Sequence, residues 1–167
     1  LSRLDTRAEP FLELDSGALV ASAWQNLARQ AEESNARIHY VKLPKICGDV
    51  SQLKQLFYHL FDNAIKFRRK DVPPEIKVSA VRQGNSWQFQ VEDNGIGVRA
   101  EQREYIFTLF KHYHEHNDFS GVGIGLTLCR KIVRRHDGDI WCGAAKENGT
   151  IFTFNLPLSM ADPRQSF

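Results

Sequence analysis

The sequence lacks the features that mark several common classes of protein. It has no excess of charge of one sign, since 22 lysines and arginines stand against 20 aspartates and glutamates, for a formal net charge of +2. This balance argues against nucleic acid or an anionic membrane surface as a partner. No apolar run approaches the roughly 20 residues that span a bilayer, and the mixed, charged start is not a secretory signal. We therefore expect a cytoplasmic location, with no nucleic-acid partner and no membrane contact.

Cysteines are few, and repeats are absent. Cys47, Cys129 and Cys142 show neither the spacing of a metal site nor that of a disulfide framework. We interpret them as small buried apolar side chains in a reducing compartment. The 167 residues contain no repeat or low-complexity segment and are close to the size of one domain. Because the first residue is not methionine, we expect a fragment of a longer protein.

What the sequence does contain is ample core material, including 11 phenylalanines and 3 tryptophans. Helical periodicity predicts one helix from about residue 16 to 35, a second after Asp49 or Ser51, a third after Gly121, and a short helix at 100–105. Strands are predicted at residues 11–14, 38–43, 76–81, 87–91, 140–142 and 151–156. The irregular alternation, with adjacent strand pairs, favours a two-layer α/β sandwich in which helices cover one face of a mixed sheet.

The second helix carries the first candidate site. His59, Asn63, Lys66 and Phe67 are spaced at i, i+4, i+7 and i+8, so they share one side of the helix. An amide oxygen suits a hard cation such as Mg²⁺, and a lysine suits a phosphate. Taken alone, this segment is better interpreted as an amphipathic helix with a solvated polar face.

The second candidate is the acidic end of a strand. Asp93 is in phase with the apolar positions of residues 87–91, so its carboxylate points inward and needs hydrogen-bond donors. The exocyclic amino group of adenine would be one such donor, and Gly95 and Gly97 would let the backbone approach a ligand. The alternative is a simple hairpin turn, which is disfavoured because residues 98–105 look helical.

Two further segments complete the set. Gly121, Gly123 and Gly125 open the third helix, where backbone N–H groups and the helix field suit phosphates. The spacing is neither the dinucleotide fingerprint nor a Walker motif, and a flexible hinge is an equal alternative. In the last strand, Thr150 shares a face with Phe152, which directs its hydroxyl towards Asp93; a plain edge strand is the alternative.

In this order, the segments resemble the nucleotide-binding boxes of the histidine-kinase branch of the ATPase superfamily shared with gyrase, heat-shock chaperones and mismatch-repair ATPases. Residues 63–67 resemble the N box, 93–97 the G1 box, 107–110 the F box and 121–126 the G2 box. Residues 63–68 and the pair Ile140-Trp141 are most similar to the phytochrome-like group. The resemblance covers about residues 11–158 and implies a Bergerat-type ATP-binding fold.

The resemblance also implies roles for individual residues. At the base, Asp93 would accept from the adenine amino group, helped by a water and Thr150, while Phe67 packs near the ring and Gly95 and Gly97 make room. At the phosphates, Asn63 would coordinate Mg²⁺ and Lys66 would contact a phosphate. The remaining ATP-binding residues would be Gly121, Gly123, Gly125 and Leu126 of the G2 box, and Lys111, His112 or His114 of an ATP lid.

Two departures from the family concern histidine. His59 stands where the family often has a second asparagine. An imidazole is a poor match for Mg²⁺, so weak metal binding or low activity is open, and a packing or surface role for His59 is favoured over metal ligation. None of the six histidines lies in a helical His-Glu or His-Asp context ahead of the boxes. The histidine that accepts the phosphoryl group is therefore expected outside this chain.

These observations define the expected organisation and partners. Residues 1–9 would be a linker or the end of a dimerisation helix, 10–158 the ATP-binding catalytic domain, and 159–167 a C-terminal tail. The resemblance implies Mg²⁺ and ATP as ligands, and as partners the histidine-bearing dimerisation domain of the same protein and the receiver domain of a response regulator. The fragment would bind Mg-ATP without phosphorylating itself.

Two other functions stay open. One is a nucleotide-sensing or docking module of the same fold, motivated by His59. The other is a different ATPase of the superfamily, such as a gyrase-like clamp or an anti-sigma serine kinase. The F box and the helix-like residues 1–5 argue against this last reading.

Overall fold

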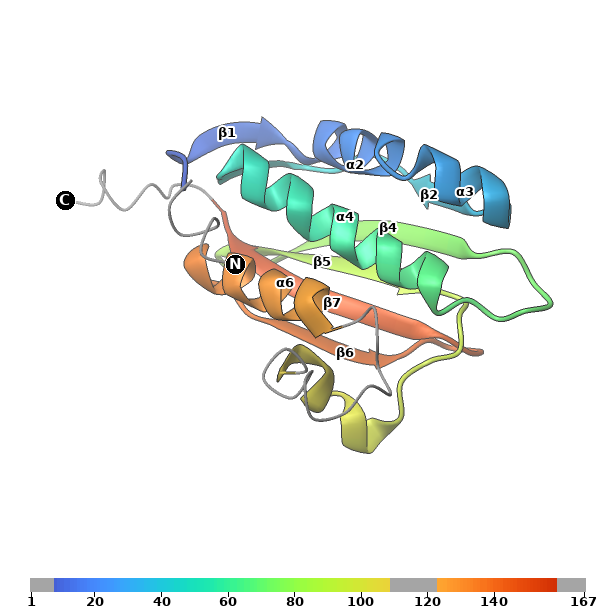
Figure 1. The fold of residues 1–167 in the computed structure, drawn as a ribbon. Coiled ribbons are helices and arrows are strands. Elements are labelled where there is room, and N and C mark those ends of the chain that lie inside the picture. The colour runs from blue at the N-terminus through green and yellow to red at the C-terminus, as the bar shows by residue number, and fades with distance from the viewer. Residues whose placement is uncertain (1–7, 109–122, 159–167) are drawn as a thin grey trace.

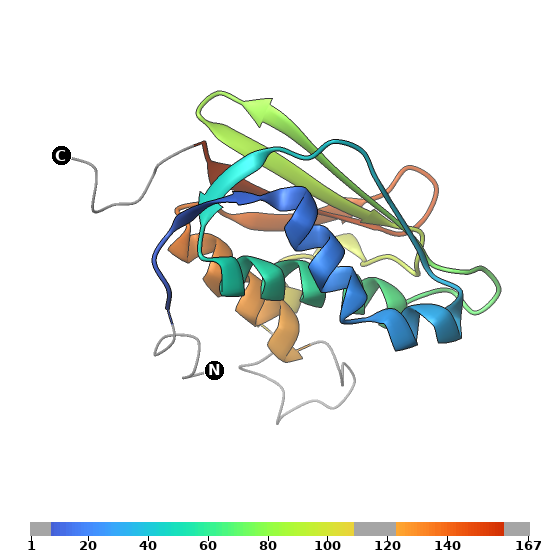
Figure 2. The ribbon, with the colours of Figure 1, turned by 90° about the horizontal axis from the view of Figure 1, so that it is seen from above.

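The computed structural model describes residues 8–108 and 123–158, which form a layer of helices on one face of a mixed sheet (Figures 1 and 2). The helices are α2 (Ser16–Gln25), α3 (Ala28–Ser34), α4 (Val50–Lys66) and α6 (Gly123–Arg135). Helix α4 lies between α2 and α6. The predicted two-layer α/β sandwich is therefore confirmed.

The main sheet has five strands in the order β2-β4-β5-β7-β6. They are β2 (Arg37–Tyr40), β4 (Glu75–Gln83), β5 (Ser86–Asp93), β6 (Ile140–Ala144) and β7 (Thr150–Pro157). Strand β2 is parallel to β4, and the other pairs are antiparallel. Glu92 pairs with Ile151, so the end of β5 lies beside the start of β7. This register brings Asp93 next to Thr150, although 57 positions separate them.

Helix α4 is the centre of the core. Asp49 caps its N-terminus, accepting a hydrogen bond from Gln52 N at 3.0 Å, which meets an otherwise unsatisfied donor of the first turn. Its apolar stripe is fully buried, and Phe57 contacts both Phe89 of β5 and Phe154 of β7. The helix predicted after Asp49 or Ser51 is thus confirmed.

The segment before β1 (Leu12–Asp15) is fixed to the ends of α4 and α6. Asp49 is fully buried and accepts from Glu9 N at 2.7 Å and from Arg135 Nη1 at 2.9 Å. Phe11 stacks on the ring of His136 at 4.5 Å, and His136 Nε2 accepts from Asp49 N at 3.0 Å. A buried polar joint therefore connects the start of α4 to the end of α6.

The structure departs from the predicted elements in three places. The single helix at 16–35 is two helices, because the chain turns at Asn26 and the side chain of Leu27 enters the core with no exposed surface. Asparagine is a weak helix former, since its side chain competes for backbone hydrogen bonds. A short strand, β3 (Lys45–Gly48), follows Pro44 and pairs with β1, where no strand was expected. The predicted helix at 100–105 is two 3-10 turns, η1 (Ala100–Gln102) and η2 (Tyr105–Thr108).

The three cysteines carry free thiols and are buried or half-buried. Cys129 and Cys142 are buried and Cys47 is half-buried, all as free thiols. Burial raises the pKa of the Cys142 thiol to about 11 and that of Cys129 further. Within residues 8–108 and 123–158, no helix has the length and apolar character needed to cross a bilayer.

Candidate functional site

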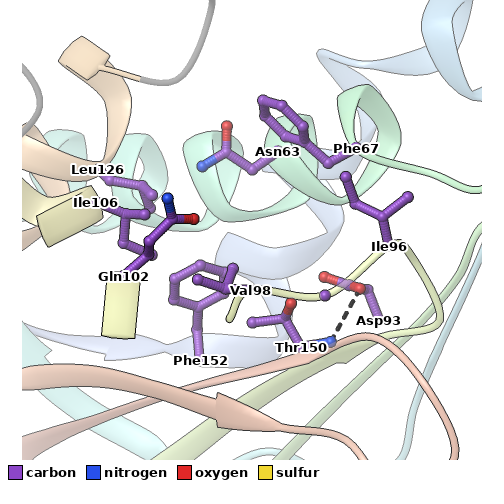
Figure 3. Close-up of a pocket in the computed structure, with 11 residues that line it drawn as sticks. Asn63, Phe67, Asp93, Ile96, Val98, Gln102, Ile106, Leu126, Thr150 and Phe152 are labelled. Atoms are coloured by element: carbon purple, nitrogen blue, oxygen red, sulfur yellow. Dashed lines mark hydrogen bonds between the residues drawn. The ribbon is translucent and has the colours of Figure 1, made fainter. Parts of the chain in front are cut away.

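A cavity of about 270 Å³ opens between α4, the segment after β5, the 3-10 turns and the start of β7 (Figure 3). Most of its lining is apolar, contributed by Phe67, Ile96, Val98, Ile106, Leu126 and Phe152. Its polar side chains are few, namely those of Asn63, Asp93, Gln102 and Thr150. An apolar cavity with a few convergent polar groups is typical of a small-molecule site. The structure thus brings together residues from the N box, the G1 box, the start of α6 and the last strand.

Asp93 supplies the charged group of the cavity. Its Oδ1 accepts from Gly95 N at 2.9 Å and from Thr150 N at 3.2 Å, while Oδ2 has no hydrogen-bond partner within residues 8–108 and 123–158 and is available to a ligand. Burial raises the pKa of Asp93 to about 6, and the two backbone hydrogen bonds oppose this rise. At neutral pH the group is therefore mainly a carboxylate, an acceptor for an amino group. Thr150 contacts Asp93 through its backbone N–H, whereas its hydroxyl had been expected to do so.

Glycines allow the backbone to close around Asp93. A Cβ on Gly95 would lie 2.5 Å from Phe67 O, the carbonyl that also accepts from Ile96 N at 3.0 Å. Gly149 has a φ of +111°, and a Cβ there would overlap the carbonyl oxygen of Asp93. A side chain at either position would separate the G1 segment from α4 or β7. The close approach predicted for Gly95 is thus to α4, while Gly97 lines the cavity itself.

Asn63 is the buried amide of the cavity. It is 7% exposed, and its Nδ2 has no hydrogen-bond partner among the residues the structure places. Leaving such a group unsatisfied costs about 1–3 kcal/mol, so a ligand that pairs with it gains binding energy. Phe67 ends the same helix and lies near Ile96 at one end of the cavity (Figure 3). The predicted neighbours Asn63 and Phe67 therefore both face the site.

Lys66 and His59, on the same helix, do not line the cavity. Lys66 Nζ lies 3.0 Å from Asp62 Oδ2, and its side chain is 46% exposed. His59 lies beneath the first turn of α6, where a Cβ on Gly125 would be 3.2 Å from His59 Nδ1. Burial lowers the pKa of His59, so its ring is neutral at pH 7. In the structure His59 packs against the start of α6, and a role in metal binding stays a prediction.

Only some of the residues expected to bind the phosphates of ATP lie in the described part of the chain. Gly123 begins α6, Gly125 lies in its first turn, and Leu126 lines the cavity. Gly121, Lys111, His112 and His114 lie outside the described residues. In the part of the chain that is placed, no group of three or more His, Cys, Asp or Glu side chains is suited to hold a metal ion. A metal ion bound in this cavity would therefore need ligands other than a cluster of these side chains.

Sequence reasoning missed several cavity residues. Gln102 and Ile106 form a wall opposite α4, while Ile96 of the G1 box and Val98 just after it also line the cavity. The apolar residues carry no chemical signature, and the helical pattern at 100–105 does not show that the 3-10 turns return Gln102 to the cavity. A polar residue shortly after the G1 box was the only available signal.

Among the described residues, an inward carboxylate, a buried amide nitrogen without a partner and the start of α6 surround one apolar cavity, an arrangement typical of a nucleotide-binding α/β domain. The chain belongs to the family described as histidine kinase-, DNA gyrase B-, and HSP90-like ATPases, whose profile matches residues 48–160. This confirms the predicted superfamily, and the relatives confirm its histidine-kinase branch.

Two relatives illustrate that relationship. The chain is 36% identical over 157 residues to phytochrome-like protein Cph1 of Synechocystis sp., covering 94% of this chain and 21% of Cph1. It is 37% identical over 117 residues to the adaptive-response sensory kinase SasA of Thermosynechococcus vestitus, covering 70% of this chain and 30% of SasA. The chain therefore spans less than a third of the length of these relatives. The phytochrome-like similarity predicted from the N box is confirmed.

Solved structures show the same fold. Full-length ShkA in complex with AMPPNP matches with a TM-score of 0.76 at 24% identity, covering 96% of this chain and 34% of that one. The nucleotide-free catalytic domain of histidine kinase ThkA matches with a TM-score of 0.71 at 24% identity, covering 89% and 97% of the two chains. The predicted Bergerat-type fold is confirmed.

Proposed function

We propose that this domain binds Mg-ATP in the cavity and transfers the γ-phosphoryl group to a histidine on a dimerisation domain outside this chain. One observation carries the proposal: the carboxylate of Asp93 and the amide of Asn63, whose Nδ2 has no partner among the described residues, face the same apolar cavity. The carboxylate suits the amino edge of a purine. The Nδ2 of Asn63 suits a phosphate oxygen, and its Oδ1 suits a cation such as Mg²⁺.

The base would lie between the apolar walls. Asp93 Oδ2 accepts from the adenine amino group, while Oδ1 stays occupied by Gly95 and Thr150. Phe67 and Phe152 supply aromatic and apolar contact on the cavity walls. Because Asp93 can only accept when ionised, this arrangement favours a base with an amino group over one with a carbonyl at that position.

The phosphates would lie towards Asn63 and the start of α6. The residues present fit Mg²⁺ only in part: Asn63 offers one amide oxygen, and phosphate oxygens and waters would complete the shell, as is usual for this ion. Mg²⁺ held there would neutralise phosphate charge. We propose that Lys66 exchanges Asp62 for a phosphate, and that backbone N–H groups of Gly121, Gly123 and Gly125 bind the chain of phosphates, with Lys111 or His112 nearby.

This domain contributes positioning and charge, and a response regulator would receive the phosphoryl group in the end. Histidine kinase ThkA has been solved in complex with the response regulator protein TrrA. By that analogy, we propose a receiver domain as the later partner and the histidine-bearing domain of the parent protein as the direct acceptor.

Phosphotransfer in trans tests the proposal. The chain is mixed with labelled Mg-ATP and the separately prepared histidine-bearing domain of its parent. We expect acid-labile label on the acceptor and none on this chain, with loss of transfer in Asn63→Ala. Nucleotide binding without transfer would instead support the sensing or docking module that His59 suggests. Steady hydrolysis without any acceptor would point to a gyrase-like ATPase.

A further inference from the structure

The wall of the cavity opposite α4 is formed by residues 99–108, called here the 3-10 wall. It contributes Gln102 and Ile106 to the cavity. Its own backbone hydrogen bonds are local, such as Gln102 N to Arg99 O at 2.9 Å and Phe107 N to Glu104 O at 3.3 Å. It belongs to no strand of the sheet. Side chains must therefore do much to hold this wall against the rest of the domain.

Arg130 of α6 contacts the 3-10 wall at two points. Its Nη1 lies 2.8 Å from Glu104 Oε1, and its Cζ lies 4.5 Å from the centre of the Phe107 ring. One helical turn earlier, Thr127 Oγ1 donates to Phe107 O at 3.1 Å. One face of α6 thus contacts the carboxylate of Glu104 and both the ring and the backbone carbonyl of Phe107.

Phe107 connects these contacts to the residues that line the cavity. Phe107 is 2% exposed and meets Phe152 edge to face, with ring centres 6.1 Å apart. Phe152 and the neighbouring Ile106 both line the cavity, as does Leu126 of α6. Displacement of Phe107 would therefore move the apolar surface that faces the base.

The contribution of Arg130 to folding stability does not explain why a charged side chain occupies this position. The Arg130 side chain is only 11% exposed, while its partner Glu104 is 77% exposed. Its Nε is buried without a hydrogen-bond partner among the placed residues. Replacing such a partly satisfied buried charge by an apolar side chain of similar volume is often neutral or stabilising. What the planar guanidinium adds is geometry, since it can pair with a carboxylate and stack on a ring together, as lysine cannot.

We propose that Arg130 is a positioning residue that fixes the 3-10 wall against α6 and so sets the affinity for the adenosine part of the nucleotide. The contacts of Arg130 with Glu104 and Phe107 are called here the Arg130 clamp. The identity of the ligand rests on the proposed function, but the clamp rests on these contacts alone. Because α6 also begins at the glycine-rich segment, the clamp joins the base side of the cavity to the helix at its phosphate side.

The test compares Arg130→Met with Arg134→Met. Arg134 lies on the same helix, is 57% exposed and pairs with Asp139 at 3.6 Å; it acts on Glu104 of the wall only through its charge, more weakly than Arg130 does. We expect Arg130→Met to weaken adenosine binding by about tenfold, the scale of one cation–π contact. Its melting temperature should stay within about 2 °C of the parent chain, and Arg134→Met should change neither. Arg130→Lys should restore little affinity.

A merely structural Arg130 predicts a different result, in which affinity and melting temperature fall together in Arg130→Met. That outcome, or unchanged adenosine affinity, overturns the proposal. Glu104→Gln tests the pairing: alone it should weaken binding, and combined with Arg130→Met it should add almost nothing further. Full additivity of the two losses would also count against the clamp.

Hydrogen exchange separates this proposal from the function on which it rests. Without any ligand, the amides of residues 99–108 should exchange several-fold faster in Arg130→Met than in Arg134→Met. If the parent chain binds no adenosine, the proposed function fails while this measurement still judges the clamp. Equal exchange in the two variants overturns the clamp whether or not nucleotide binds.

Discussion

Asp93 combines two opposing influences in one side chain. Burial raises its pKa to about 6, while Gly95 and Thr150 donate to Oδ1 and favour the charged form. Binding of an amino group at Oδ2 requires an acceptor, so protonation competes with the base. We expect the affinity for adenosine to fall as pH drops from about 7.5 to 5, with a midpoint near 6. Adenosine is the right probe, because a phosphate group also titrates near pH 6.

Asp93→Asn is the matched control for this titration. We expect it to bind adenosine about 10- to 100-fold more weakly, since a lost hydrogen bond to a charged group is worth about 1.5–3 kcal/mol. Its residual binding should show no midpoint near pH 6. A flat profile for the parent chain, or normal adenosine binding by Asp93→Asn, would remove Asp93 from the base site.

Asn63 supports a second prediction at the same scale. With Asn63→Ala, the gain in ATP affinity on adding Mg²⁺ should shrink by about tenfold or more, because the amide is the one protein ligand we assign to the ion. Adenosine affinity should change much less. Calorimetric titrations with and without Mg²⁺ measure both quantities, and equal losses for ATP and adenosine would contradict the assignment.

The residues that the sequence could predict were those whose direction follows from local periodicity. Asp93 continues the inward phase of Phe89 and Val91, and Asn63 lies beside the buried stripe of α4. Lys66 shares that helix, yet it pairs with Asp62 one turn before it. Its long, exposed side chain is directed by a competing charge, which helical spacing does not predict. Gln102 reaches the cavity only because the chain folds back after β5.

At the scale of elements, the buried joint between α4 and α6 depends on Asp49. Its carboxylate caps α4, accepts from Glu9 N and pairs with Arg135. We expect Asp49→Ala to lower the free energy of unfolding by about 3–5 kcal/mol, because it leaves buried donors unpaired. Asp49→Asn should cost less, since asparagine is an equally good cap. Urea denaturation measures both.

The control for this prediction is the cap of α2. Asp15 accepts from Gly17 N at 2.9 Å in an exposed turn, so Asp15→Ala should cost only about 1 kcal/mol. If Asp49→Ala cost no more than Asp15→Ala, the buried joint would add nothing beyond an ordinary cap.

Helices and strands could be predicted where apolar residues recur on one face over many positions. Helix α4 has a continuous apolar stripe and a capping acid, and its predicted position agrees with the structure. The break between α2 and α3 was not predicted, because residues 16–35 keep a helical pattern and the turn at Asn26 depends on burying Leu27. Strand β3 has four residues and forms only by pairing with β1. Such pairing depends on contacts distant in sequence, which no local window contains.

At the scale of the whole molecule, the layers could be predicted, while the order of strands came from the structure. Adjacent strand pairs and intervening helices are sufficient to indicate an α/β sandwich. The order β2-β4-β5-β7-β6 places the last strand between two earlier ones. That arrangement brings Thr150 to Asp93, so the site is a consequence of topology as much as of motif.

Three buried titratable groups give the domain opposing responses to acid. Burial lowers the pKa of His136 and of His59 below 6.5, and it raises the pKa of Asp93 from 3.8 to about 6. Below pH 6.5 these two histidines bind more protons in the unfolded chain than in the folded one. Their contribution to stability therefore decreases as the pH is lowered. Between pH 6 and 3.8 the folded chain binds the extra proton at Asp93, so its contribution rises as pH falls.

Comparing variants isolates these contributions, because the other acids titrate equally in each. Asp93→Asn removes the only opposing group of the three, so its free energy of unfolding should fall more steeply than the parent's between about pH 6 and 4. The difference accumulated over that range should approach about 3 kcal/mol, the equivalent of a shift from 3.8 to about 6. His136→Gln should flatten the loss between pH 6.5 and 5. Urea denaturation across this range measures all three slopes. A parent curve steeper than that of Asp93→Asn would reverse the sign assigned to the buried acid, and with it the conclusion that burial destabilises the carboxylate form of Asp93.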